Sequence, residues 1–298
     1  MKGYKAFNKG LICLDKQYAE NTVFEENLAV ICHRGMHFCE NPFDVLDYYP
    51  LVDGNGDFSD FAEVEALDDV KTDDDKKFCT TKLRVGAKLN FGEFVKACVD
   101  FSINSTKLKA KKGKLNDGGG DYAKIGSSGY SAQIGSSGDS AKIGSSGDSA
   151  KIGSIGYSAK IGSSGDSAQI GSSGDSAQIG SSGYSAQIGS SGYSAKIGSS
   201  GDYAKIGSSG DYAKIGSSGD YAKINSTGED SVVCCAGHYS IVKAKKGSWI
   251  TLSEWKHDPV KGRWIPACVK TEYVDGERIK ADTFYKLIDG NFEEIKED

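Results

Sequence analysis

A nine-residue unit, G-[DY]-[SY]-A-[KQ]-I-G-S-S, repeats from Gly120 to about Lys245 in this 298-residue chain. Twelve close copies follow one another without a gap, and two looser copies continue from Gly228 and Gly237. A short fixed period is typical of a solenoid, in which each unit buries its apolar side chains only by stacking on its neighbours. One unit is too short to enclose a core, so we expect two units per coil in a parallel β-roll. Seven coils would form a rod about 34 Å long at about 4.8 Å per coil.

Each unit contains one strand signal, x-Ala-Lys/Gln-Ile, and one turn signal, Gly-Ser-Ser-Gly. Successive side chains on a strand point to opposite faces, so we expect Ala123 and Ile125 to face the interior and Tyr122 and Lys124 the solvent. The Ala and Ile positions are invariant through the twelve close copies, whereas the outward positions vary between Ser and Tyr and between Lys and Gln. We expect the glycines to take the positive-φ corners and the serines to bond the turn backbone.

The composition of the repeat argues against three specialised kinds of solenoid. A calcium roll needs about six to eight oxygen ligands per ion, but the one repeated carboxylate position holds Tyr in four of the twelve close copies. An ice-binding face would present a regular Thr array, and a mimic of DNA would carry an excess of acidic residues; the repeat has neither. We therefore expect a rigid spacer or display surface without a cofactor.

The later copies supply the candidate partner-binding residues. Three consecutive copies carry Tyr203, Tyr212 and Tyr221, and aromatic side chains are frequent anchors of protein interfaces. A lysine follows each tyrosine by two residues, at Lys205, Lys214 and Lys223. These six residues are the predicted contact surface, with the tyrosines as an aromatic patch.

The repeat divides the chain into segments and predicts a mainly β protein. We expect a small α+β domain at 1–103, a linker or first coil at 104–119, the solenoid at 120–245 and a β-rich cap at 246–298. In the first domain the apolar patterns predict strands at 4–7, 28–32, 36–39, 61–67 and 80–85, and helices at 43–49 and 91–99. In the cap they predict strands at 248–255, 264–273 and 283–288.

Several motifs of the first domain resemble an uncharacterised domain that is common in phage and prophage proteins. They are Tyr4–Asn8, Arg34–Pro42, Tyr48–Pro50 and Ala62–Ala66. Relatives of that domain are often followed by similar repeats and by a Trp-Ile-x-Leu-x-Glu-Trp tail, which Trp249–Trp255 fits. The resemblance implies a phage-related origin and no particular activity.

A second resemblance concerns catalysis. Gly35-Met36-His37-Phe38, followed by a helix, is similar to the Gly-x-Tyr-Phe strand and helix of ADP-ribosyltransferases. In that family the tyrosine stacks on nicotinamide, an upstream His or Arg grips NAD, and a later Glu orients the ribose. The resemblance would place His37 at the tyrosine position, Lys5 at the upstream position and Glu63 or Glu65 as the acid.

The acidic loop Asp53-Gly54-Asn55-Gly56-Asp57 begins like an EF-hand. That motif requires Gly at its sixth position and Glu at its twelfth, where this chain has Phe58 and Val64. A solvated turn is therefore favoured over a calcium site formed by Asp53, Asn55 and Asp57.

The eight cysteines form no C-x-x-C pair. Cys32 and Cys39 lie near His33 and His37, but their spacing matches no zinc finger. We expect both cysteines to be buried free thiols.

The net charge of −5 gives no basic footprint for nucleic acid. The chain contains no apolar run of about 18 residues and begins without a signal-peptide core, so we expect a cytoplasmic protein that does not span a membrane. The sequence thus favours a non-catalytic scaffold that binds a protein partner. An ADP-ribosyltransferase-like enzyme and a homo-oligomeric fibre are the alternatives.

Overall fold

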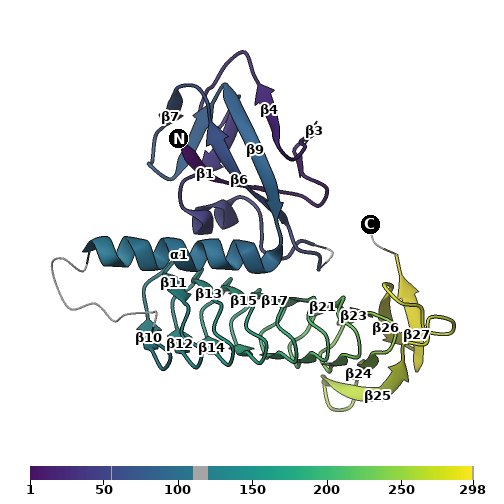
Figure 1. Ribbon diagram of the computed structural model, residues 1–298. Helices are drawn as coiled ribbons and strands as arrows, with labels where there is room; N and C mark the ends of the chain where they lie inside the picture. Colours follow the sequence, from purple (N-terminus) through teal and green to yellow (C-terminus); the bar gives the residue numbers. More distant parts are fainter. Residues whose placement is uncertain (55, 110–119, 297–298) are drawn as a thin grey trace.

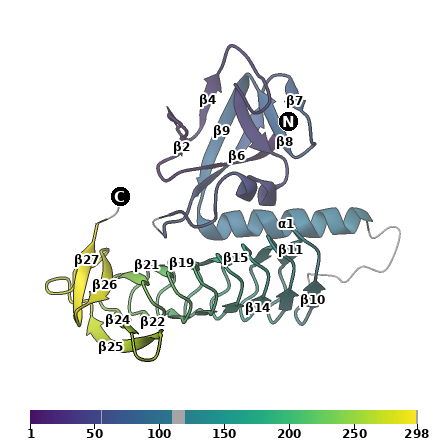
Figure 2. The same cartoon turned by 180° about the vertical axis from the view of Figure 1, so that it is seen from behind.

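The computed structural model describes residues 1–54, 56–109 and 120–296. The protein has three parts: a small N-terminal α+β region, a parallel β-solenoid of seven coils, and a β-rich end piece (Figure 1). The long helix α1 (Phe91–Lys109) lies along the solenoid, between it and the N-terminal sheet, in both views (Figures 1 and 2). The predicted fold class is confirmed.

The N-terminal region is built on a seven-stranded antiparallel sheet with β1 at its centre. The strand order is β4-β9-β6-β1-β5-β8-β7. These strands are β1 (Lys2–Phe7), β4 (Thr22–Glu25), β5 (Met36–Cys39), β6 (Asp60–Ala66), β7 (Val70–Thr72), β8 (Lys77–Thr80) and β9 (Lys82–Leu89). A separate small hairpin joins β2 (Ile12–Cys13) and β3 (Lys16–Gln17).

Some predicted elements of this region differ from the observed ones. The predicted strand at 28–32 is wrong, because only Val30 forms a bridge, to Arg34, and the chain then turns with Cys32 at φ 61°. The segment 80–85 is divided between the end of β8 and the start of β9. The helix predicted at 43–49 is a 3-10 helix, η1 (Pro42–Asp47), capped by the Asn41 side chain.

Helix α1 extends well beyond the predicted end at Val99. It begins with a capping box, in which Glu93 N–H donates to Asn90 Oδ1 (2.9 Å) and Asn90 N–H donates to Glu93 Oε2 (2.8 Å). It continues to Lys109 and so includes the first residues of the predicted linker. The rest of that linker, 110–119, lies outside the described residues.

Alternate copies of the repeat form two parallel in-register sheets. The open sheet contains β10 (Lys124–Ser127), β12 (Lys142–Ser145), β14 (Lys160–Ser163), β16 (Gln178–Ser181), β18 (Lys196–Ser199), β20 (Lys214–Ser217) and β22 (Val232–Cys235). The covered sheet contains β11 (Gln133–Ser136), β13 (Lys151–Ser154), β15 (Gln169–Ser172), β17 (Gln187–Ser190), β19 (Lys205–Ser208), β21 (Lys223–Ser226) and β23 (Ile241–Ala244). Two units per coil are therefore confirmed.

The strand of each unit is Lys/Gln-Ile-Gly-Ser, so it begins later than predicted. Isoleucine and the first serine point inward, as at Ile170 and Ser172, which are both 0% exposed. The alanine lies just before the strand and is equally buried, as at Ala168. Lys/Gln and glycine therefore form the two outward rows of each sheet, and the predicted turn Gly-Ser-Ser-Gly is wrong in its first half.

The positive-φ corners are taken by residues other than glycine. Ten residues at the third position of the unit have φ between 51° and 59°, whereas no glycine of the described solenoid has a positive φ. These residues are Ser131, Ser149, Ser167, Ser185, Ser194, Tyr203, Tyr212, Tyr221, Asp230 and Tyr239. The left-handed conformation costs about 1 kcal/mol per residue, but it directs the N–H to the next coil, as from Ser149 to Asp166 O (2.8 Å).

The first glycine of each unit is required for close stacking. A Cβ added to Gly165 would overlap the carbonyl group of Gly147, one coil away, and Gly183 stands in the same relation to Gly165. This backbone contact recurs at successive units and each time joins two glycines 18 residues apart, and no side chain fits into it.

The predicted serine bonds are present in only some of the copies. The Ser154 hydroxyl accepts from Gly156 N–H at 3.4 Å. The buried hydroxyls of Ser163 and Ser181, by contrast, have no hydrogen-bond partner among the described residues.

The end piece closes the solenoid with two hairpins. In one, β24 (Trp249–Asp258) continues the open sheet in parallel and β25 (Arg263–Tyr273) pairs antiparallel with it. In the other, β26 (Phe284–Ile288) and β27 (Asn291–Ile295) extend the covered sheet. Their inward side chains, such as Leu252 and Tyr285, continue the isoleucine core. The three strands predicted in this segment are confirmed.

The glycine contact predicts a large difference between substitutions at two glycines that lie three residues apart. Gly165→Ala should lower the free energy of unfolding by about 2–4 kcal/mol, because the new methyl group meets backbone atoms that cannot move independently. Gly162→Ala should change it by at most about 0.5 kcal/mol, because a Cβ there has no atom within 4 Å. Urea unfolding of both variants checks this; equal stabilities would contradict the stacking role of Gly165.

Candidate functional site

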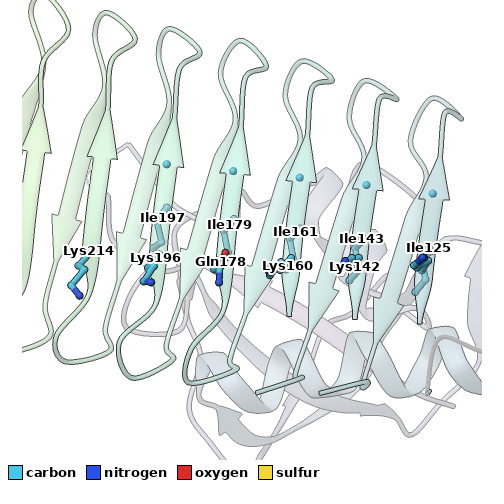
Figure 3. A pocket seen from close by; sticks show the side chains of 16 residues that line it. Ile125, Lys142, Ile143, Lys160, Ile161, Gln178, Ile179, Lys196, Ile197 and Lys214 are labelled. Carbon is cyan, nitrogen blue, oxygen red and sulfur yellow. The ribbon is translucent and has the colours of Figure 1, made fainter. Parts of the chain in front are cut away.

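The outer face of the open sheet carries a long groove of about 950 Å³. Its walls and floor are the Lys/Gln row, the backbone of the isoleucines and the glycine row of successive strands. Figure 3 shows Lys142, Lys160, Lys196 and Lys214 standing in one line across the strands, with Gln178 between the two pairs. The groove is therefore a regular surface with one row of cations and one row without side chains.

The lysines of the groove are exposed and uncompensated. The strands pair in register, so that Lys142 lies beside Lys160 and Lys196 beside Lys214. Among the described residues none of these four forms an ion pair. Neighbouring ammonium groups at a coil spacing of about 5 Å repel by about 1 kcal/mol even in water, so an acidic partner would relieve a real cost.

The glycine row of the open sheet is equally uncovered. A Cβ added at any of its six glycines would have no atom within 4 Å. They are Gly126, Gly144, Gly162, Gly180, Gly198 and Gly216. Glycine weakens a strand, and in strands it often marks a place where another backbone or a ligand approaches closely.

On the covered sheet the corresponding glycine row is filled. Helix α1 places Ser102 against Gly135, Val95 against Gly171 and Phe91 against Gly189. The helix rises about 5.4 Å per turn and the coils repeat at about 4.8 Å, so roughly one helical turn packs on each coil. Beyond the end of the helix, Phe58 continues the row over Gly207.

The Lys/Gln row of the covered sheet is also engaged, by the segment 41–57. Gln133 Nε2 donates to Asp44 Oδ1 (2.7 Å), and Gln169 Nε2 donates to Leu46 O (3.2 Å). Lys151, only 3% exposed, donates to Phe43 O (3.0 Å) and to Asp47 Oδ1 (2.5 Å). The two sheets thus present the same two rows, occupied on one side and open on the other.

The structure does not bring the six predicted partner-binding residues together, because consecutive copies belong to opposite sheets. Tyr203 and Tyr221 stack at 4.8 Å on one edge of the solenoid, whereas Tyr212 packs against Tyr193 (5.0 Å) on the other. Of the lysines, Lys214 belongs to the open sheet, and Lys205 and Lys223 belong to the covered sheet.

A signal for the open-sheet lysines was present in the sequence. When the copies are separated by parity, five of the six groove positions hold Lys, whereas three of the six on the covered sheet hold Gln. The glutamines fall where the N-terminal region needs neutral donors and acceptors, so the two sheets have diverged according to what they contact.

In the N-terminal region, two of the predicted catalytic residues meet and the third does not. Lys5 and His37 line a cavity of about 690 Å³, and Lys5 Nζ donates to the backbone oxygen of His37 at 2.9 Å. Glu65 lies outside this cavity and pairs with Arg84 (2.9 Å). Glu63 is likewise on the outer side of β6. Neither of the two glutamates predicted as the catalytic acid therefore lies in the cavity with Lys5 and His37.

His37 holds a loop in place. Its Nε2 accepts from the backbone N–H of Cys32 at 3.1 Å, at the turn where Cys32 has a positive φ. Burial, and then the nearby ammonium groups of Lys5 and Lys77, lower the pKa of His37.

The acidic loop forms a turn against the solenoid. Asp53 Oδ1 accepts from Asp57 N–H (3.0 Å), and Asp57 accepts from Asn225 Nδ2 (3.1 Å). Asn55, the third predicted ligand, lies outside the described residues. In the described parts of the chain no group of three His, Cys, Asp or Glu side chains is placed to hold a metal ion.

The two cysteines singled out in the sequence differ in exposure. Cys39 is a buried free thiol, and burial raises its pKa to about 12. Cys32 is exposed, contrary to prediction, because its segment is a turn and not a strand. Its sulfur accepts from Lys77 Nζ at 2.9 Å.

These features define a β-solenoid protein with an N-terminal α+β region docked on one of its sheets. Residues 1–97 match the family model of a domain of unknown function, DUF7666. No curated protein and no solved structure matches the chain. Within the described residues, no helix combines the length and apolar character needed to cross a membrane.

The contrast between the two lysine rows predicts different effects of the same substitution. Lys151→Met should lower the free energy of unfolding by about 1–2 kcal/mol, because it removes buried bonds to Phe43 and to the half-exposed Asp47. Lys160→Met on the open sheet should cost less than about 0.5 kcal/mol. Urea unfolding measures both, and a Lys160→Met effect as large as that of Lys151→Met would refute the assignment of the two sheets.

The His37 bond predicts a pH-dependent loop. Because the folded pKa lies below the ordinary 6.5, the bond contributes fully above about pH 6.5 and is lost as the pH falls through the folded pKa. An NMR titration should give a His37 pKa below 6.5, with the Cys32 amide losing exchange protection on acidification. His37→Gln should make that protection independent of pH. A pKa at or above 6.5 would contradict the assigned bond.

Proposed function

We propose that this protein is a non-catalytic scaffold whose open sheet binds an acidic surface of a partner protein. The observation that carries the proposal is the comparison of the two sheets. The same rows that receive α1 and the segment 41–57 on the covered sheet are uncovered on the open sheet. The covered sheet thus shows how a sheet with these two rows binds another part of the protein.

The charges of the open sheet favour a particular kind of partner. The partner would place carboxylates along Lys142, Lys160, Lys196 and Lys214 and would lay small or apolar atoms on the glycine row, as α1 does on the other sheet. Nucleic acid is a poorer match, because the net charge of the chain is −5. Two open sheets facing each other would bring like charges together, which disfavours a fibre built through this face.

The phage-related origin inferred from the sequence resemblance remains a prediction. A phage-related origin is compatible with a scaffold that binds a protein of the host or of the phage particle. Under that prediction, the partner would come from one of these two sources. The edge tyrosines Tyr203 and Tyr221 were predicted as a contact from the sequence alone. The groove proposal does not use them, and the experiment below tests them separately from the groove.

The test compares four forms of the full-length protein as affinity baits, the wild type and three double variants. Retained proteins are identified by mass spectrometry and then purified for titration calorimetry. One variant, Gly162→Leu with Gly198→Leu, fills the glycine row without changing charge. A second, Lys160→Glu with Lys196→Glu, reverses charge without adding bulk. The matched control, Tyr203→Ser with Tyr221→Ser, places on the edge the serine that most copies already have at that position.

We expect both groove variants to weaken binding of the purified partner by at least about tenfold and the tyrosine variant to leave it unchanged. Binding should also weaken as salt is raised, because the lysines are exposed. A partner whose affinity is the same for wild type and both groove variants would refute the groove as the binding face. Circular dichroism confirms that each variant is folded.

A further inference from the structure

A second site lies in the N-terminal region, about which the proposed scaffold function says nothing. Strands β1 and β5, the loop after β2, the turn at 32–35 and the segment 45–49 enclose the cavity of about 690 Å³ that Lys5 and His37 line. Its volume is within the range of about 300–1,000 Å³ typical of small-molecule sites. The cavity lies in the part of the molecule that is turned away from the open sheet (Figure 1).

The unusual group in this cavity is Lys5, which is 6% exposed on the central strand β1. Its Nζ donates to His37 O (2.9 Å) and lies 5.4 Å and 5.5 Å from the ring centroids of Phe7 and Tyr18. Among the described residues it has no carboxylate partner. A buried ammonium without a carboxylate counter-charge is costly. The two ring faces, the one carbonyl and a hydrogen bond with the Cys13 side chain offset only part of that cost.

Further cations surround the cavity. Arg34, Lys16 and Lys77 also line it, against two acids, Asp15 and Glu26. Glu26 is engaged in an ion pair with Lys16. Lys77 bonds Cys32 and lies over the Tyr48 ring at 4.7 Å, and Arg34 is exposed at the turn. The four cations therefore outnumber the acids, and Lys5 is the most buried of them and has no carboxylate partner among the described residues.

The remaining walls are apolar or aromatic. Tyr18, Phe38, Val45 and Tyr49 line the cavity, and the Tyr49 hydroxyl is already used in a bond to Cys13 Sγ (3.1 Å). These side chains offer flat surfaces and few free polar groups. A ligand that fills the space therefore needs one compact charged group and an apolar, preferably planar, body.

We infer that this cavity binds a small organic oxyanion, with its carboxylate or phosphate group on Lys5 and an apolar ring against Tyr18 and Phe38. The anion supplies the counter-charge that Lys5 lacks, and Arg34 contributes a second cation from the rim. Burial lowers the pKa of the Lys5 ammonium, and an anion bound beside it would favour the charged form and raise that pKa.

The experiment uses the full-length protein and four probes: benzoate, phenyl phosphate, inorganic phosphate and the neutral analogue benzamide. We expect titration calorimetry to detect benzoate or phenyl phosphate, and to detect benzamide at least tenfold more weakly. Preference between the two ring-bearing anions identifies the acid group, and inorganic phosphate shows how much the ring contributes. In NMR the His37 ring signals should shift on binding, because that side chain lines the cavity.

Variants locate the site. Lys5→Met should weaken the preferred anion by at least tenfold, and Arg34→Met, at the exposed rim, by a smaller factor of about three to ten. Lys96→Met is the control, because Lys96 lies on α1 and pairs with Asp100, away from the cavity; its affinity should equal that of wild type. Should Lys5→Met not fold, Arg34→Met and the His37 shifts decide.

Three outcomes would overturn the inference: wild-type protein that binds neither ring-bearing anion, benzamide binding as tightly as benzoate, or affinity unchanged by both Lys5→Met and Arg34→Met. None of these outcomes depends on the open sheet. The cavity and the proposed scaffold function therefore stand or fall separately.

Discussion

The close backbone contact at the first glycine of each unit is the constraint on which the solenoid depends. It brings each turn directly onto the carbonyl of the turn 18 residues earlier, as Gly165 lies on Gly147. With this distance set at both edges, the strands pair in register and the isoleucines of the two sheets fill a thin interior. The serines and tyrosines in left-handed conformation then return their N–H groups to the neighbouring coil. The regular shape of the solenoid therefore depends on glycine, which has no side chain, at the first position of each unit.

The second glycine of the unit has a different consequence, because it faces outward. On the covered sheet it lets α1 approach until Val95 and Phe91 touch the strand backbone, and Lys151 becomes a buried anchor for the segment 41–57. On the open sheet the same position leaves a bare floor beside exposed lysines. One short sequence thus forms both an internal interface and an exposed groove. The two sheets differ in what has docked on them and in the share of Lys and Gln at the outward position.

The repeat allowed the solenoid, its two units per coil and its seven coils to be predicted, because the Ala and Ile positions can be buried only by stacking. It did not show which residues turn the corners. Glycine is the usual positive-φ residue, yet here Ser149 and Tyr203 take that conformation, since the glycine is needed for stacking. The tyrosine patch was misplaced because neighbours in sequence alternate between the two edges. The sequence resemblance named both Lys5 and His37, and the structure places both at one cavity. Glu65 lies elsewhere, because it is on the outward face of β6. The sequence of short antiparallel strands without a regular repeat does not show which face of a strand will point outward.

The assignment of alternate copies to opposite sheets also limits how such a chain can change in length. Losing one nine-residue unit would move every later strand to the other side of the rod, so that residues shaped for the groove would face α1 and the hairpins of the end piece would meet the wrong sheets. Losing two adjacent units would shorten the rod by one coil and leave every remaining contact in phase. The heritable step in the length of this solenoid is therefore 18 residues, twice the period that the sequence displays.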